Sequence, residues 1–340
     1  MGTQLTYLNE PNMEKEIDEN ENDEYDAVAC SMQGWRTNME DAHLLELDFE
    51  PGMHLFGVFD GHGGKEVAMY AARELIQTFK DSFPSKANPF KGSTVDEDLL
   101  DPDSVEQALI NSFIGIDKKL STKQVKKELM EIRNNNPEGK NPFLELLGLS
   151  DEIDRGKTEG INIFDSIGCT ANVLFIHEGK YYCANAGDSR CVISQRGRAV
   201  ELSQDHKPED PIEYQRITNA GSVVVDGRVD GNLNLSRSIG DLHHKQKNLP
   251  VEEQPITCVP DVTIRDIDED DDFIVLACDG IWEVKDSQQV VDFIDEKLST
   301  NTDIEDIVKE LLNEVCSEDC NKDQSLGCDN MTCIIINIKR

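Results

Sequence analysis

The sequence predicts an α+β fold built mainly from antiparallel sheet. Three strand-like segments follow one another at 26–32, 42–47 and 55–59, with only polar connections between them. Because parallel strands need a long crossover between them, this succession favours antiparallel pairing. Apolar residues then recur at helical spacing over 65–83 and 104–120, which predicts two helices covering one face of a sheet.

The second half of the chain repeats this order of strands followed by helices. A hairpin is predicted at 169–186, where two apolar runs flank a turn at Glu178-Gly179-Lys180. The remaining elements are a helix around 212–220, short strands around 222–229, a buried strand at 273–278, helices at 287–298 and 304–315, and a last strand at 331–338.

Two segments are too polar in composition to form part of a packed core. Residues 1–24 are rich in Glu, Asn and Asp, so we expect a flexible acidic arm before a single domain at 25–340. Residues 121–162 are rich first in Lys and Glu and then in Asn and Pro, which indicates an insertion that is mobile in part, with a helix over 125–132. A substrate-selecting flap and a passive surface loop are equally compatible with this composition.

The charge balance argues against one class of partner. The chain carries 68 acidic and 33 basic residues, a formal charge of −35. Binding to a phosphate backbone requires clustered Lys and Arg, so no nucleic acid partner is expected. No apolar run reaches the ~18 residues of a membrane span and no signal peptide opens the chain, so we expect a cytoplasmic or nuclear protein.

The N-terminal residues Met1-Gly2-Thr3-Gln4-Leu5-Thr6 fit the pattern for myristoylation of Gly2. One acyl chain gives only marginal binding, and the acidic segment 14–26 is repelled by anionic lipid. Any membrane association is therefore expected to be weak and reversible.

The ten cysteines are spread along the chain without a tight framework, which favours reduced thiols over disulfides. The nearest approach to a zinc site is the set Cys316, Cys320, Cys328 and Cys333, whose spacings lack a paired CxxC.

Four aspartates stand at the ends of predicted strands. Asp60, Asp188 and Asp279 each follow a strand, and Asp329 precedes the last one. If these strand ends converge, the carboxylates and the Gly61 carbonyl could hold Mg²⁺ or Mn²⁺, which favour oxygen ligands. Two such ions can share a carboxylate and lower the pKa of a bridging water. Each aspartate could instead cap a helix or a turn, and the spacing does not decide between these readings.

Two further side chains suit the chemistry of phosphate esters. Arg36 offers a bidentate fork for a phosphate group, and His62 offers a general acid for the leaving oxygen.

Eight short motifs resemble those of the metal-dependent serine/threonine phosphatases of the protein phosphatase 2C family, and they occur in that family's order. They are GWRTNMEDAH at 34–43, VFDGHGG at 58–64, GCTAN at 168–172, NAGDSR at 185–190, DHKP at 205–208, LSRSIGD at 235–241, ACDGIWE at 277–283 and DNMT at 329–332. The resemblance covers about 25–338 apart from the insertion. It implies an α-β-β-α sandwich of two mostly antiparallel sheets flanked by helix pairs, with a binuclear metal site in a cleft at one edge of the sheets.

The resemblance also implies which residues bind the metals. In the family, the position matching Asp60 bridges two ions, that of Gly61 gives its carbonyl to the second, and those of Asp279 and Asp329 bind the first. A weaker third site uses the positions of Asp188, Asp279 and Glu283. The family more commonly has an aspartate where Glu283 stands, which puts the geometry of that third site in question.

The remaining roles follow from the same resemblance. Glu40 and Asp41 match acids that hold metal-bound water, Arg36 matches the phosphate-binding arginine, and His62 matches the proposed proton donor. Asp241 lies in a motif that we interpret as structural. The start MGTQLT also resembles that of myristoylated members.

The prediction is a monomeric, Mg²⁺/Mn²⁺-dependent phosphatase that acts on phosphoserine and phosphothreonine in proteins. Its two metal ions activate a water for direct attack, without a phosphoenzyme.

Three alternatives compete with this function. Cys30 and Arg36 have the C-x5-R spacing of cysteine-dependent phosphatases, although Cys30 lies inside a strand pattern. An aspartyl-phosphate mechanism requires a second acid two residues after Asp60, where His62 stands. A calcium-binding or scaffold protein is suggested by the acidic run at 266–272, but that run lacks the Gly and Glu that an EF-hand loop needs at its sixth and twelfth positions.

Overall fold

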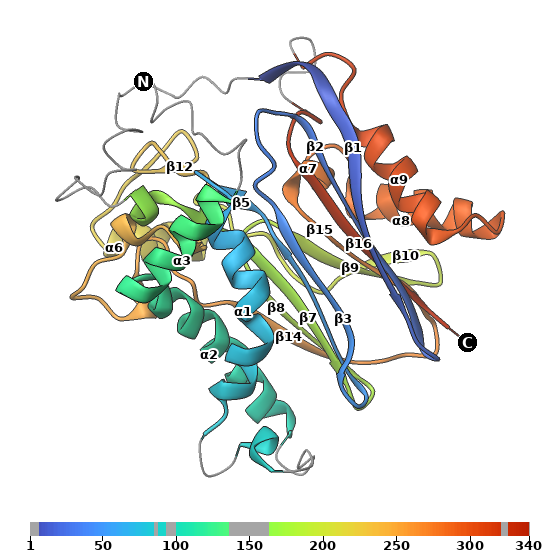
Figure 1. Cartoon of the computed structure of the whole chain (residues 1–340), viewed down its shortest axis with the longest axis horizontal. Coiled ribbons are helices and arrows are strands. Elements are labelled where there is room, and N and C mark those ends of the chain that lie inside the picture. The colour runs from blue at the N-terminus through green and yellow to red at the C-terminus, as the bar shows by residue number, and fades with distance from the viewer. Residues whose placement is uncertain (1–6, 85–87, 93–99, 136–162, 321–325, 340) are drawn as a thin grey trace.

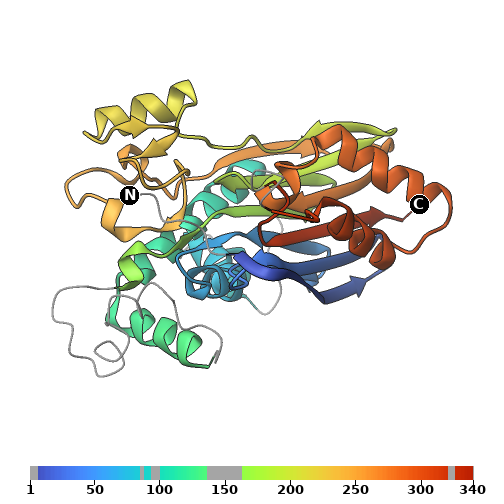
Figure 2. The same cartoon turned by 90° about the horizontal axis from the view of Figure 1, so that it is seen from above.

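Two antiparallel sheets lie face to face, and helices cover the outer face of each sheet (Figures 1 and 2). The computed structural model describes residues 7–84, 88–92, 100–135, 163–320 and 326–339. The predicted α+β class and the α-β-β-α sandwich are confirmed.

The larger sheet has six strands in the order β1-β2-β16-β15-β9-β10, and all neighbours are antiparallel. These strands are β1 (Tyr7–Glu21), β2 (Tyr25–Arg36), β9 (Arg190–Gln195), β10 (Arg198–Glu201), β15 (Asp271–Ala277) and β16 (Met331–Ile338). Helices α8 (Ser287–Ser299) and α9 (Ile304–Val315) pack on its outer face. The central strands β15 and β16 are nearly continuous apolar runs because helices cover one face and the second sheet covers the other.

The smaller sheet has five strands in the order β14-β8-β7-β4-β3. They are β3 (Ala42–Glu50), β4 (Met53–Phe59), β7 (Ala171–His177), β8 (Lys180–Ala186) and β14 (Asp261–Asp266). Helices α1 (Glu66–Ser82) and α2 (Pro102–Leu120) cover its outer face, and α3 (Lys123–Asn134) contacts both helices (Figure 1). Helix α2 starts where Asp101 accepts a hydrogen bond from the Ser104 amide at 3.1 Å, a typical N-cap.

Short elements lie beyond the sheet ends. A three-stranded sheet joins β13 (Ile239–Gly240), β6 (Gly168–Cys169) and β5 (Gly61–His62). The hairpin β11 (Val224–Val225) and β12 (Arg228–Val229) lies next to α6 (Pro211–Asn219), and α7 (Asp279–Trp282) follows β15. Short 3₁₀ turns occur at Pro89–Lys91, Ile163–Ser166, Leu242–His244 and Val251–Glu253.

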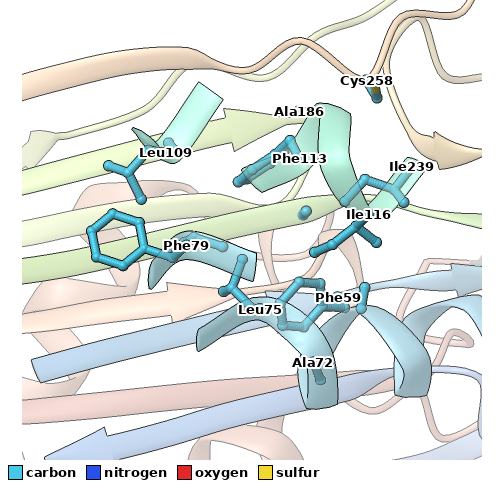
Figure 3. Close-up of a cluster of buried hydrophobic side chains, with 14 of the residues drawn as sticks. Phe59, Ala72, Leu75, Phe79, Leu109, Phe113, Ile116, Ala186, Ile239 and Cys258 are labelled. Carbon is cyan, nitrogen blue, oxygen red and sulfur yellow. The ribbon is translucent and has the colours of Figure 1, made fainter. Parts of the chain in front are cut away.

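The apolar core positions the polar residues at the sheet ends. One buried cluster fills the space between the sheets, and two more lie under the helix pairs. In the cluster under α1 and α2, Phe59, Ala186 and Ile239 are fully buried (Figure 3). These three residues stand one or two positions before Asp60, Asp188 and Asp241. Truncating a buried Phe costs about 3–5 kcal/mol, so the backbone that carries these acids is firmly anchored.

The expectation of a flexible arm over residues 1–24 is corrected for residues 7–21, because Tyr7–Glu21 forms strand β1 and pairs with β2, while residues 1–6 lie outside the described residues. The polar composition did not prevent this, since an edge strand needs backbone partners more than it needs buried side chains. Ile17 supplies the apolar contact by packing against the core under α8 and α9.

Other differences concern short strands and one pair of cysteines. Strands β9, β10 and β14 were not predicted. The expectation of ten reduced cysteines is wrong for Cys320 and Cys328, which form a disulfide.

The inserted segment is described only in part. The helix expected over 125–132 is present within α3, while residues 136–162 and Gly2 lie outside the described residues. Within the described part of the chain, every helix is too short or too polar to cross a membrane.

Candidate active site

Three aspartates from separate parts of the chain meet at one end of the two sheets. Asp60 follows β4, Asp188 follows β8 and Asp279 begins α7 directly after β15. One carboxylate oxygen from each lies within 4.8 Å of the other two. Strand ends from both sheets therefore converge as the sequence analysis required for a shared metal site.

The glycine after two of these aspartates is explained by close backbone contacts. A Cβ on Gly61 would overlap the Glu40 carbonyl oxygen, and a Cβ on Gly280 would overlap the Asn330 carbonyl oxygen. Each Asp-Gly pair thus lets a neighbouring segment approach the carboxylate closely.

The charges of this cluster oppose one another. The pKa values of Asp60 and Asp279 are raised well above the usual range, chiefly by burial and then by neighbouring carboxylates. Burial raises the pKa of Asp41 to about 7. Such a group is costly to ionise unless a cation compensates it.

Unsatisfied oxygen atoms indicate where a cation would fit. Asp41 Oδ1 and Asp188 Oδ1 are buried without a hydrogen-bond partner among the described residues. The three aspartates that meet here offer carboxylate oxygens, and an oxygen donor set suits Mg²⁺ and Mn²⁺. The residues present therefore fit the metals that the sequence predicted.

Glu40 and Asp41 reach the cluster from the connection between β2 and β3. Asp41 Oδ2 accepts a hydrogen bond from Thr332 Oγ1 at 2.7 Å, and the Glu40 amide donates to Asn330 Oδ1 at 2.9 Å. Asn330 Nδ2 in turn donates to the carbonyl of Gln33 at 2.8 Å. Asn330, just before β16, and Thr332 within it thus hold the β2–β3 connection in place beside the three aspartates. Burial raises the pKa of Glu40.

Asp329 lies beside the group of three and is paired with a cation of the chain itself. Arg36, the last residue of β2, donates through Nη2 to Asp329 Oδ2. Burial lowers the pKa of Arg36, but Asp329 outweighs this effect and raises it overall. Arg36 Nε is buried without a partner among the described residues, so the guanidinium keeps a donor for another ligand.

His62 is held by Asp241, an acid whose motif the sequence indicates to be structural. Its Nε2 lies 2.8 Å from Asp241 Oδ2. Although burial lowers the pKa of His62, Asp241 raises it overall, while His62 holds the pKa of Asp241 down at about 2 against the effect of burial. The available signal was the acid at the end of a Gly-containing motif, but local sequence does not show which imidazole it meets.

Lys207 is a second residue that the sequence analysis did not single out. Its Nζ donates to Asp188 Oδ2 at 2.5 Å, so the chain places its own ammonium group at the edge of the acidic cluster. The DHKP motif was the signal that could have drawn attention to it.

Glu283 lies close to the same cluster. It is exposed just after α7, and its amide donates to the Asp279 carbonyl at 2.9 Å. Desolvation raises the pKa of Glu283, and the charges of Asp329 and Asp188 add to this rise.

The cysteine-dependent alternative is not supported by the surroundings of Cys30. Its side chain is fully buried in β2, and burial raises its pKa to about 11. A thiolate nucleophile needs exposure and a lowered pKa, and Cys30 has neither.

Comparisons with known proteins agree with this architecture. The family model described as "Protein phosphatase 2C" matches residues 25–135 and 148–324. The Paramecium tetraurelia protein named "Probable protein phosphatase 2C 6" is 39% identical over 336 residues, which is 98% of this chain and 99% of that protein. The Arabidopsis thaliana protein named "Probable protein phosphatase 2C 21" is 37% identical over 363 residues, which is 98% of this chain and 93% of that protein.

A solved structure shares the fold. It is described as serine-threonine phosphatase 2C from Toxoplasma gondii, with a TM-score of 0.66, 17% identity and 98% coverage of both chains. With its motifs, sandwich architecture and full-length relatives, the chain belongs to the protein phosphatase 2C family of metal-dependent serine/threonine phosphatases.

Proposed function

We propose that the chain hydrolyses phosphoserine and phosphothreonine in proteins by direct attack of water, without a phosphoenzyme intermediate. The observation that carries this proposal is the meeting of Asp60, Asp188 and Asp279 within 4.8 Å. Beside them lie a guanidinium group, that of Arg36, and an imidazole, that of His62.

Two divalent cations fit the acidic cluster. Asp60, the Gly61 carbonyl, Asp279 and Asp329 would hold them. Glu40 and Asp41 would hold water on them by hydrogen bonds. When bound, these cations lower the pKa of a water and neutralise charge on the phosphoryl oxygens.

A weaker third cation would be held by Asp188, Asp279 and Glu283. The longer side chain of Glu283 reaches the site from exposed surface after α7, and Lys207 already pairs with Asp188. Both features support weaker binding at this position than at the first two.

Arg36 binds and orients the phosphate group. Its orphaned Nε and the fixed end of β2 support this role, because a planar guanidinium can donate two parallel hydrogen bonds to phosphate oxygens. Asp329 holds the guanidinium in place before the substrate binds.

His62 donates a proton to the leaving oxygen of serine or threonine. An alkoxide is a poor leaving group, so proton transfer matters more for these substrates than for aryl phosphates. The ring is one-quarter exposed, which leaves it accessible from the site.

The deciding experiment is hydrolysis of a phosphothreonine peptide by the purified chain with Mn²⁺, with Mg²⁺ and after exhaustive chelation, repeated with Cys30→Ser. Activity that needs the metal and is unaffected by Cys30→Ser supports the proposal. Activity that survives chelation but is lost in Cys30→Ser would contradict it, and no activity in any condition would favour a scaffold that only binds partners.

Several properties stay predictions from the sequence. They are a monomeric state, a cytoplasmic or nuclear location, and myristoylation of Gly2 with weak, reversible membrane association. Gel filtration, cell fractionation and intact-mass measurement of the protein from a eukaryotic host test them in turn.

A further inference from the structure

The three-stranded sheet beyond the main sheets brings together three motifs from distant parts of the chain. His62 of β5 pairs with Gly168 of β6, and Gly240 of β13 pairs with the same Gly168 from the other side. Asp241 follows Gly240 directly, so the sheet places an imidazole and a carboxylate side by side.

Asp241 is built tightly into this position. Its side chain is 2% exposed, and Oδ2 lies 2.8 Å from His62 Nε2. Ser238 Oγ donates to the same oxygen at 2.5 Å, and the Asp241 amide donates to the Ile167 carbonyl at 2.9 Å. Two donors on one oxygen and a fixed backbone leave this carboxylate little freedom to move.

The backbone at Asp241 adopts a conformation that a non-glycine residue seldom takes. Its φ is +48°, in the left-handed region. Strain of this kind persists where surrounding contacts impose it. The strained turn directs the carboxylate to His62 Nε2.

Gly168 provides the space for this pair. A Cβ at this position would overlap Asp241 Oδ2 and lie 2.8 Å from His62 Nε2. The missing side chain is therefore what allows the carboxylate and the imidazole to meet.

We propose that Asp241 is the positioning residue for His62: by holding Nε2, it fixes the ring so that Nδ1 faces the leaving group. Among the described residues His62 Nδ1 has no hydrogen-bond partner, and it is the ring nitrogen left for the substrate. This inference rests on the proposed function. Among the described residues, no hydrogen bond links Asp241 to the acidic cluster or to Arg36.

The oxygen of water forms a new bond to phosphorus and the water releases one proton to solvent, while the bond between phosphorus and the serine or threonine oxygen breaks with its electron pair on that oxygen. The oxygen takes a proton from His62 Nδ1 to give the alcohol, and the ring regains a proton from solvent after inorganic phosphate leaves. Asp241 keeps its bond to Nε2 throughout.

The test compares Asp241→Asn with the wild type on a phosphothreonine peptide and on p-nitrophenyl phosphate. We expect kcat on the peptide to fall about 10- to 100-fold with little change on the aryl ester, whose leaving group needs no proton. In a His62→Ala background the same substitution should cause no further loss. Equal loss on both substrates, or losses that multiply in the double variant, would show that Asp241 only supports the fold.

Two further measurements keep the proposal testable if Asp241→Asn folds poorly. Gly168→Ala should push the pair apart and give the same selective loss on the peptide. Ring ¹⁵N and proton NMR of His62 in the intact protein should show an Nε2–H hydrogen-bonded to a carboxylate, and a free Nε2 would overturn the proposal.

The matched control is Asp226→Asn. Asp226 is also an aspartate with a left-handed backbone, at φ +50°, but it is exposed and outside the site. It should keep wild-type rates on both substrates, and the same loss in this variant would also overturn the proposal. A wild-type protein without metal-dependent turnover would instead refute the proposed function and leave the NMR result to judge the pair.

Discussion

Arg36 donates a hydrogen bond to Asp329, so the predicted phosphate-binding side chain is anchored by a predicted metal ligand. Arg36 ends β2, and Asp329 lies two residues before β16, which pairs antiparallel with β2 in the larger sheet. Phosphate binding and metal binding are thus linked through one ion pair.

Replacing Arg36 by Lys tests phosphate binding separately from metal binding. Arg36→Lys keeps a positive charge near Asp329 but loses the planar fork, and a lost charge-assisted hydrogen bond costs about 1.5–3 kcal/mol. We expect KM for a phosphopeptide to rise about 10- to 100-fold while Mn²⁺ affinity, measured by calorimetry, changes little. A large loss of Mn²⁺ binding would show that Arg36 serves mainly to hold the metal ligands.

Asp60→Asn should abolish turnover and leave the fold intact. The pKa of Asp60 is raised by burial and by Asp279, so a neutral amide removes repulsion from the metal-free cluster. We therefore expect the melting temperature in chelator to stay the same or to rise. Full turnover in this variant would remove the metal hypothesis.

The metal-free protein should become less stable as pH rises from about 4 to about 7. Asp41 has a folded pKa of about 7 against an ordinary value of 3.8, so in this window the native state holds a proton that the unfolded chain has lost. Stability then falls with pH, and Asp60 and Asp279 act in the same direction. Urea unfolding in chelator at several pH values measures this.

Mn²⁺ should restore stability most strongly above pH 7, because it binds deprotonated carboxylates. In Asp41→Asn, the free energy of unfolding measured in chelator should fall less steeply with pH than in the wild type. A metal-free stability that rises with pH over this window would contradict the cluster's assignment as mutually repelling acids.

Removing the ammonium group of Lys207 should strengthen cation binding at Asp188. The Nζ lies 2.5 Å from Asp188 Oδ2, where it competes for that oxygen. Lys207→Met is expected to tighten the weakest Mn²⁺ binding step in a calorimetric titration. Lys285→Met is the control, since Lys285 pairs with Glu314 on α9, and an identical change in both variants would exclude a local effect.

Strand β1 should be protected in amide hydrogen exchange. Residues from Lys15 to Glu21 pair with β2 in continuous register, so their bonded amides should exchange more slowly than those of an unstructured acidic peptide. Ile17→Ala should lower stability by about 1 kcal/mol because Ile17 is half-buried against the core. Uniformly fast exchange over this segment would restore the flexible arm.

The sequence predicted most of the longer helices and strands, because the pattern that indicates each of them lies within the element itself. Apolar runs predicted β4, β7, β15 and β16, and helical spacing predicted α1, α2, α8 and α9. The short strands β9, β10 and β14 were not predicted because each has only two or three apolar residues, too few for a strand pattern, and they become strands only through pairing with a neighbour. Strand β1 escaped for the same reason.

The candidate site also has one part that the sequence predicts and one part that it does not. The sequence by itself determined which residue types could carry the chemistry, because Asp60, Asp279 and Asp329 stand at strand boundaries and Arg36 and His62 stand in the same motifs. Only the tertiary structure decided which groups meet. Asp241 reaches His62 across 179 positions of sequence because β5 and β13 flank β6. Contacts of this kind depend on sheet register and on space left by residues such as Gly168, which no local pattern encodes.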